Sequence, residues 1–312
     1  MELSIIIVNY NGGMLVDACL ESIYAHPPAT AFEVVLIDNA STDGSGARVH
    51  AAFPALRYIA NDSNDGLARA FNKGLAAAQG RYLLALDNDT RILPGALRSL
   101  LDFMDANPDV GATGSLLLNP DLTPQRTFRR KPSALNAVFG RRSLITRLWP
   151  SNPLSSRYLM SEKGETADPF EVDWVSTAAL MVRHDVYTSV GGLDEDFFVY
   201  WVDADWCARI RAGSWKIFAV PASRVIHDEN LKARRRARRN VRMLIDFHRG
   251  AYLYYRKNHT RSALNPMAWI ALIGLSLRAG SMIGWDYLKF EILGRFAAHG
   301  RAATGNSTPR GR

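Results

Sequence analysis

Residues 83–90, Leu-Leu-Ala-Leu-Asp-Asn-Asp-Thr, form an apolar run that ends in two carboxylates one residue apart. Side chains at positions i and i+2 of a buried strand point to the same side, so Asp87 and Asp89 leave the strand end as a pair that can share one cation. Mg²⁺ commonly takes one or two carboxylates and leaves its other positions to water and phosphate oxygens. An Asp-x-Asp sequence also occurs in ordinary turns, so the rest of the chain must decide between a metal site and a plain turn.

Short apolar runs alternate with helical patterns on both sides of residues 83–90. We expect strands at 3–8, 34–37, 57–59, 82–86 and 110–116. We expect helices at 14–24, 66–78 and 94–107. This alternation predicts an α/β fold with a mainly parallel sheet and helices on both of its faces.

Polar residues follow three of the expected strands. Asn9 and Tyr10 follow the first strand, Asp38 and Asn39 the second, and residues 87–89 the fourth. Ligands of such sheets bind at the carboxyl ends of the strands, so these residues are expected to converge on one edge. Asp38 could accept the imide N–H of a uracil or thymine base there, although a plain turn into a helix would have the same sequence.

A segment rich in Asn, Asp and Gly, residues 61–74, follows the third expected strand. Gly66 permits a sharp turn, and the small residues after it let the N-terminus of a helix approach a ligand closely. Asn72 on that helix would then face a nucleotide. A structural Asn-rich helix cap is the alternative.

The second half of the chain is less regular. Residues 119–170 lose their periodicity and are expected to form an acceptor-side insertion over the active edge. Strands are expected again at 178–182, 216–220 and 225–227, and the acidic segment 200–206 leads into a helix at 205–211.

The net charge of +8 is unevenly distributed. Residues 1–230 hold 21 Lys and Arg against 27 Asp and Glu, whereas residues 231–312 hold 17 against 3. A basic tail on an acidic body suggests an anionic partner, either phospholipid or nucleic acid. We therefore expect one domain at 1–230, a basic helical extension at 231–300 that associates with an anionic membrane surface, and a disordered tail at 301–312.

Within the extension, residues 264–285 are apolar apart from Arg278 and nearly long enough to span a bilayer. Because Asn265, Pro266 and two glycines weaken that interpretation, we favour a helix in the membrane interface over one packed on the body, with a spanning helix third. The two cysteines have neither disulfide nor zinc spacing, and the N-terminus does not resemble a signal peptide. These features predict a cytoplasmic protein, peripherally associated with the inner face of the membrane.

Six ordered motifs give the chain a family resemblance over about residues 3–230. They are 4–12, 38–45, 64–74, 87–89, 191–198, and Asp203-Ala204-Asp205 with His227. In these motifs the sequence resembles the inverting nucleotide-sugar glycosyltransferases of family 2, which have the GT-A fold. It is most similar to the rhamnosyltransferase-like and galactofuranosyltransferase-like members.

The resemblance implies a role for each matching residue. The donor nucleotide would lie beside Asn9, Tyr10, Asp38, Asn39, Gly66, Asn72, Asp87 and Asn88, with Asp87 near the ribose. Asp89 and His227, and more weakly Asp87, would bind a divalent cation, Mg²⁺ or Mn²⁺. Neutral imidazole is a reasonable ligand for an ion such as Mn²⁺.

Inversion requires a carboxylate that takes the proton of the acceptor hydroxyl as this attacks the anomeric carbon. Asp203 matches the family's catalytic aspartate, and Asp205 is the alternative base or a supporting residue. Many relatives carry a second acidic residue where this chain has Val202, so the acceptor is less defined than the chemistry. The metal offsets the charge of the leaving diphosphate, so no covalent intermediate is required.

The sequence thus predicts a glycosyltransferase of cell-surface polysaccharide synthesis, with L-rhamnose from dTDP-rhamnose as the best donor and a saccharide, expected to be polyprenyl-linked, as acceptor. UDP-hexose or UDP-galactofuranose is the alternative donor, because uracil and thymine present the same imide edge. A dinucleotide-dependent oxidoreductase would need Gly-x-Gly-x-x-Gly after the first strand, which is lacking. A basic-tailed binding protein without catalysis is the remaining alternative, and nucleic acid is not an expected partner because no recognition module is evident.

Overall fold

A nine-stranded sheet lies in the first of two structural units, which are Met1–Lys232 and Ala233–Arg312. The computed structural model describes residues 1–125, 127–131, 149, 160, 166–228, 240–260, 262 and 264–293, with backbone alone for 291–293. Most of the expected insertion at 119–170, the basic run at 231–239 and the expected tail at 301–312 therefore lie outside the described residues.

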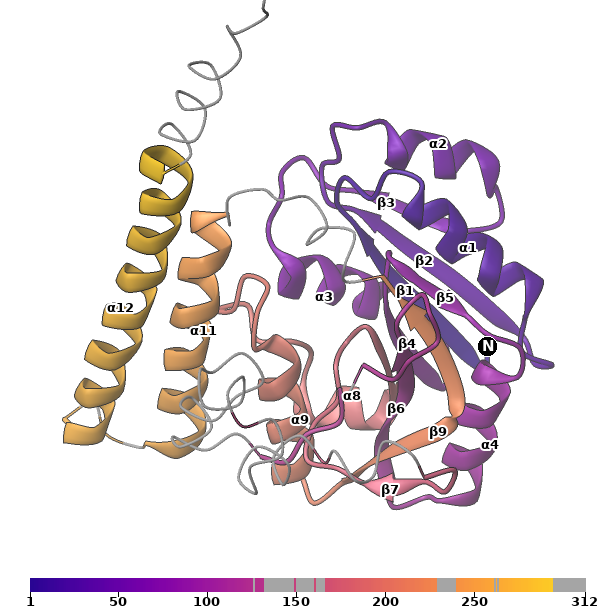
Figure 1. Ribbon diagram of the computed structural model, residues 1–312. Coiled ribbons are helices and arrows are strands. Elements are labelled where there is room, and N and C mark those ends of the chain that lie inside the picture. Colours follow the sequence, from indigo (N-terminus) through magenta and orange to yellow (C-terminus); the bar gives the residue numbers. More distant parts are fainter. Residues whose placement is uncertain are drawn as a thin grey trace, which may run out of the picture. The chain divides into compact units, whose positions relative to one another are not determined.

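The strands follow the order β3-β2-β1-β4-β8-β6-β9-β5, and β7 pairs with β9 (Figure 1). Their bounds are β1 Leu3–Asn9, β2 Phe32–Asp38, β3 Arg57–Ala60, β4 Tyr82–Asp87, β5 Thr90–Ile92, β6 Val110–Leu118, β7 Phe170–Glu171, β8 Ala179–Arg183 and β9 Lys216–His227. Among the described strands, β5, β7 and β8 run against the other six. The mainly parallel sheet is thus confirmed, with three short antiparallel strands added.

Two strand predictions need correction. The expected strands at 216–220 and 225–227 are one continuous strand, β9, whose register with β6 shifts between Ser115 and Leu116. Strands β5 and β7 were not predicted, because three and two residues are too short to show a periodicity.

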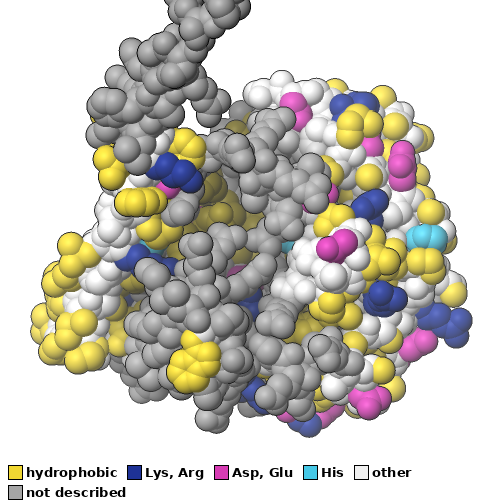
Figure 2. Space-filling view, viewed as in Figure 1, with side chains coloured by type: hydrophobic (Ala, Val, Ile, Leu, Met, Phe, Trp, Pro, Cys, Tyr) yellow, Lys and Arg dark blue, Asp and Glu magenta, His cyan; other side chains and the backbone are white. Residues whose placement is uncertain are grey.

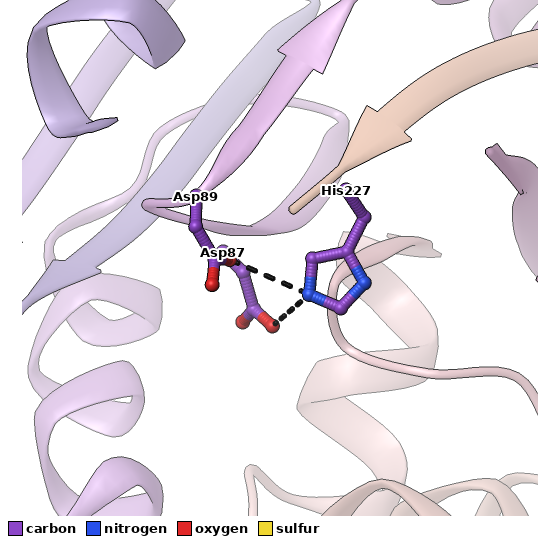
Figure 3. A group of neighbouring side chains, drawn as sticks. All are labelled: Asp87, Asp89 and His227. Atoms are coloured by element: carbon purple, nitrogen blue, oxygen red, sulfur yellow. Dashed lines mark ion pairs between the residues drawn. The ribbon is translucent and has the colours of Figure 1, made fainter. Parts of the chain in front are cut away.

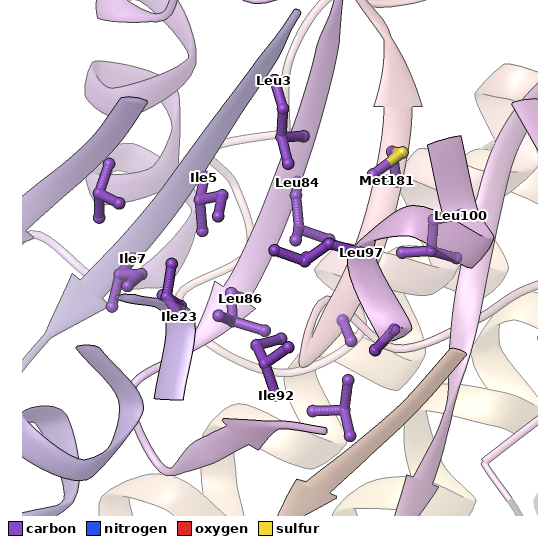
Figure 4. Close-up of a cluster of buried hydrophobic side chains, with 14 of the residues drawn as sticks. Leu3, Ile5, Ile7, Ile23, Leu84, Leu86, Ile92, Leu97, Leu100 and Met181 are labelled. Atoms are coloured by element: carbon purple, nitrogen blue, oxygen red, sulfur yellow. The ribbon is translucent and has the colours of Figure 1, made fainter. Parts of the chain in front are cut away.

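Helices cover both faces of the sheet, as expected. They are α1 Leu15–Ala25, α2 Ser45–Ala52, α3 Leu67–Ala77, α4 Ala96–Ala106, α8 His184–Val190 and α9 Val202–Ala212. Leu3, Ile5 and Ile7 of β1 join a core with residues of α1 and α4 (Figure 4). On the opposite face, Gly74 of α3 lies so close to Ile6 and Ile37 that a side chain would not fit there. Every residue of β1 is buried, which is typical of a central parallel strand.

The second unit contains α11 Val241–His259, α12 Pro266–Tyr287 and a π-helical turn at Leu288–Leu293. The side chains of Asn240 and Asn265 cap α11 and α12 by accepting hydrogen bonds from the backbone N–H groups of Met243 and Met267. Helices α11 and α12 pack side by side (Figure 1). Residues Pro266–Phe290 are long and apolar enough to cross a membrane, and little of this helix is buried.

Candidate active site

The carboxyl ends of three neighbouring parallel strands lie level with one another. Asn9 at the end of β1 pairs in register with Asp38 at the end of β2, and Val8 pairs with Asp87 at the end of β4. The polar residues that follow these strands therefore meet at one edge of the sheet, as the sequence predicted.

Asp87, Asp89 and His227 form a cluster with the composition of a divalent metal site (Figure 3). One ligand atom from each lies within 4.8 Å of the others. The His227 Nε2 atom is 3.4 Å from Asp89 Oδ1 and 3.8 Å from Asp87 Oδ2. Two carboxylates and an imidazole turned toward one point suit an ion that keeps further positions for substrate oxygens.

Backbone pairing holds the segments that carry this metal cluster together. The Thr90 hydroxyl donates to the Asp87 carbonyl at 2.7 Å and closes the turn that contains both aspartates. Thr90 also pairs in register with His227 across β5 and β9, and the backbone N–H of Asp228 donates to the Asp89 carbonyl at 2.9 Å. The three-residue strand β5 thus brings a histidine from the far end of the domain to the Asp-x-Asp turn.

Gln125 supports the metal cluster and was not predicted. It follows β6 and is buried, and its Oε1 lies 3.0 Å from His227 Nδ1 while its Nε2 donates to the His227 carbonyl at 2.6 Å. Sequence reasoning missed it because residues 119–170 were expected to be an acceptor-side insertion, and nothing in the pattern separates its first residues from the rest.

Asn9 is the centre of a buried network on the donor side. Its amide N–H group donates to Asp38 Oδ1 at 3.0 Å and to the hydroxyls of Ser41 and Ser45, and its Oδ1 accepts from Asn88 at 2.9 Å. Asn9 is completely buried, so its role in the structure is to orient Asp38 and Asn88. Tyr10, by contrast, is 48% exposed.

Asn39, Gly66 and Asn72 lie in the adjoining loops. Asn39 accepts from Asn61 at 2.9 Å and donates to the Gly66 carbonyl, so it shapes the loop before α3. Gly66 has a φ of +89°, which a side chain rarely adopts. The Asn72 amide, which was expected to face a nucleotide, exchanges two hydrogen bonds with the backbone of Leu193, both at 2.8 Å.

Asp203 lies in the first turn of α9, which begins at Val202 and not at Asp205 as expected. Trp201 precedes the helix with a φ of +72°, and the carboxylates of Asp203 and Asp205 in the first turn interact favourably with the helix dipole. Burial raises the pKa of Asp203 to about 7, and the charge of Asp87 adds to the increase. A carboxyl group with such a pKa is suited to accept a proton near neutral pH.

Asp205 is placed differently from Asp203. It is buried, and its Oδ2 accepts from Arg209 Nε at 2.8 Å one turn along α9. The same guanidinium donates to the carbonyls of Val190 and Gly192, at 2.9 and 2.7 Å. Asp205 therefore holds Arg209 where it joins α9 to the C-terminal end of α8 and the residues that follow it.

Trp201, two residues before Asp203, forms an aromatic pair with Trp174. The rings of Trp174 and Trp201 are nearly parallel, with centroids 6.5 Å apart and an interplanar angle of 4°. The Arg129 guanidinium lies 5.8 Å from the centre of the Trp174 ring, and its charge acts to lower the pKa of Asp203. Such an aromatic pair offers an apolar surface against which a sugar ring could pack.

This geometry agrees with a comparison to protein families. The chain matches the family described as glycosyl transferase family 2 over residues 4–166, just over half of its length. The chain belongs to glycosyl transferase family 2.

Relatives and solved structures of this family's fold extend the match. The chain is 27% identical over 294 residues to an N-acetylglucosaminyl-diphospho-decaprenol L-rhamnosyltransferase of Mycobacterium tuberculosis strain H37Rv, covering 90% of this chain and 92% of that protein. A mannosyltransferase from Pyrobaculum calidifontis in complex with GDP-Man and Mn²⁺ superimposes with a TM-score of 0.57 at 19% identity, covering 99% and 76% of the two chains. GalNAc-T7 with UDP, GalNAc and Mn²⁺ superimposes with a TM-score of 0.60 at 16% identity, covering 96% of this chain and 58% of that chain. The GT-A fold predicted from the sequence is confirmed.

Proposed function

We propose that this family 2 glycosyltransferase is a divalent-cation-dependent, inverting enzyme that transfers L-rhamnose from dTDP-L-rhamnose to a lipid-linked saccharide. The observation that carries the proposal is a cluster of metal-ligand type close enough to Asp203 for the charge of Asp87 to raise the pKa of the Asp203 carboxyl. The cluster of Asp87, Asp89 and His227 suits a metal, and the nearby Asp203 has a pKa matched to proton transfer.

The donor set fits a divalent cation, because two carboxylates and an imidazole converge from β4, its following turn and β9. When bound, the ion would offset the charge that develops on the diphosphate leaving group. The solved neighbours that contain Mn²⁺ together with a nucleotide or nucleotide sugar support this assignment.

Asp203 is the proposed general base. It takes the proton of the acceptor hydroxyl while that oxygen attacks the anomeric carbon from the side opposite the diphosphate. Asp205 is a less suitable base, because its carboxylate is buried in an ion pair with Arg209. We assign Asp205 a positioning role in α9.

The donor is proposed from the resemblance to the mycobacterial L-rhamnosyltransferase, which extends over nine-tenths of both chains. Asp38, which accepts a hydrogen bond from Asn9, is the proposed partner of the donor's nucleobase. Its carboxylate would accept equally from thymine and uracil, so UDP-galactofuranose or a UDP-hexose is the second candidate.

The acceptor is proposed to be a saccharide on a polyprenyl diphosphate. Trp201, two residues before Asp203, and Trp174 would offer its sugar an aromatic surface. The mycobacterial relative, an N-acetylglucosaminyl-diphospho-decaprenol L-rhamnosyltransferase, supports the lipid carrier.

We further propose that α12 attaches the enzyme to the cytoplasmic face of an anionic membrane. Hydrophobic side chains gather along this helix (Figure 2), and Trp269, Ile273, Leu277 and Trp285 are 55–70% exposed. The two tryptophans are 16 residues apart, or about 24 Å along a helix. Tryptophan is favoured at membrane interfaces, and the 17 basic residues of 231–312 would attract anionic headgroups.

A donor panel tests the catalytic proposal. Release of nucleoside diphosphate is measured from dTDP-L-rhamnose, UDP-galactofuranose and UDP-hexoses with a polyprenyl-diphosphate saccharide, for the wild type, Asp203→Asn and Asp102→Asn. Asp102 is an exposed residue of α4 and serves as the control. We expect rhamnose transfer that is lost in Asp203→Asn and kept in Asp102→Asn, whereas full activity in Asp203→Asn would exclude Asp203 as base.

Liposome flotation tests the membrane proposal. The full chain should float with vesicles that contain anionic lipid, and Ile273→Asn with Leu277→Asn should weaken this binding. Unchanged flotation of the double variant, or preferential binding of RNA by the full chain, would contradict the assignment of α12.

A further inference from the structure

The orientation of the Gln125 amide follows from its hydrogen bonds. A backbone carbonyl can only accept, so the amide nitrogen must face the His227 carbonyl, where the distance is 2.6 Å. The same nitrogen donates to Asn119 Oδ1 at 3.2 Å. The amide oxygen is thereby turned to His227 Nδ1, 3.0 Å away.

This orientation selects one form of the histidine ring. An oxygen acceptor at Nδ1 requires a proton on Nδ1, and in the neutral ring the proton is then lacking on Nε2. Nε2 is the atom that faces Asp87 and Asp89. Gln125 therefore presents a nitrogen lone pair to the centre of the cluster and fixes the plane of the ring.

We infer that Gln125 is a positioning residue that makes His227 a metal ligand and thereby gives the site its preference for Mn²⁺ over Mg²⁺. The inference rests on the proposed metal dependence. Mg²⁺ is hard, prefers oxygen ligands and gives up water reluctantly, whereas an imidazole nitrogen is a better ligand for a transition ion. Loss of the ring as a ligand should weaken Mn²⁺ binding and leave the carboxylate contribution to Mg²⁺ binding in place.

Three variants separate this role from a structural one. Gln125→Met keeps the volume of the buried side chain and removes both hydrogen-bonding groups. Gln125→Glu retains an oxygen acceptor for Nδ1. Thr123→Ala perturbs the same turn, where the Thr123 hydroxyl bonds Asn119 and Asp121, without removing a group that contacts His227.

The first measurement is the tautomer of His227 in the metal-free protein, recorded at a pH at which the ring is neutral, because a doubly protonated ring has no tautomer. Long-range ¹H–¹⁵N correlation spectra distinguish the two neutral forms, and a His227→Asn sample assigns the signal. We expect the Nδ1–H form in the wild type, Gln125→Glu and Thr123→Ala, and loss of that preference in Gln125→Met. An Nε2–H form in the wild type, or no change in Gln125→Met, would overturn the inference.

The second measurement is the affinity for Mn²⁺ alone, by electron paramagnetic resonance, and for Mg²⁺ by competition. We expect Gln125→Met to weaken Mn²⁺ binding by about 10-fold or more, since partners of a ligand typically contribute 10- to 100-fold, and to change Mg²⁺ binding by less than about 2-fold. Equal losses for both ions, no loss, or no Mn²⁺ binding by the wild type would contradict the inference. Neither measurement depends on glycosyl transfer, so failure of the proposed function would show separately in the donor panel.

Discussion

Replacement of Gly66 by alanine should destabilise the domain more than replacement of a second glycine with a similar φ. Gly66 precedes α3 with φ +89° and ψ 173°, a region that is essentially restricted to glycine and costs another residue about 1–3 kcal/mol. An added Cβ would also lie 2.7 Å from the Phe198 carbonyl oxygen and 2.6 Å from the Phe198 ring. Overpacking of this kind typically costs about 1–3 kcal/mol.

Gly95 is the matched control. It precedes α4 with φ +79° and ψ −6°, and nothing lies within 4 Å of the position of its Cβ. Gly95→Ala should therefore cost only the left-handed backbone penalty of about 1–2 kcal/mol. Gly66→Ala should cost about 2–6 kcal/mol, the sum of the backbone and overpacking contributions.

The free energies of unfolding of the wild type and both variants are compared by urea titration, with circular dichroism and tryptophan fluorescence as separate probes. The two probes show whether the two structural units unfold together. Because the Phe198 carbonyl accepts a 2.6 Å hydrogen bond from Leu67 N–H, movement of Phe198 would not relieve the contact without loss of that bond. A loss in Gly66→Ala no larger than in Gly95→Ala would refute the reasoning.

Three further predictions concern the site. Because burial raises the pKa of Asp203 to about 7 and a base must be ionised, kcat/KM should rise with pH through a midpoint near 7, and a midpoint near 4 would contradict this role. Asp205→Asn should lower the free energy of unfolding by about 3 kcal/mol, since it leaves Arg209 without its buried partner, and the folded variant should remain active. Loss of activity with unchanged stability would instead make Asp205 the base. Trp174→Ala should raise KM for the acceptor about 10-fold through loss of an aromatic contact and leave KM for the donor unchanged, and an effect confined to the donor would exclude the proposed sugar surface.

Much of the fold could be read from the sequence. The all-apolar strands such as β1 and β4, and the helices between them, carry strong local periodicity, and parallel strands of this kind must lie inside a sheet covered on both faces. The same logic predicts that Asn9, Asp38 and Asp87 meet at one edge of the sheet, and the register of β1, β2 and β4 confirms it. Strand β5 and the antiparallel direction of β8 could not be predicted from the sequence, because pairing between distant segments leaves little local signal.

By itself the sequence determined the strand ends, the Asp-x-Asp turn and the resemblance that marked His227 and Asp203. The tertiary structure decided how these groups work together. It pairs Thr90 with His227 and turns the Gln125 amide oxygen to the His227 ring. It also forms the ion pair of Asp205 with Arg209 and places Trp174 beside Trp201. Each of these contacts joins side chains according to their direction and burial, and these depend on packing across the whole domain and not on the residues nearby in the chain.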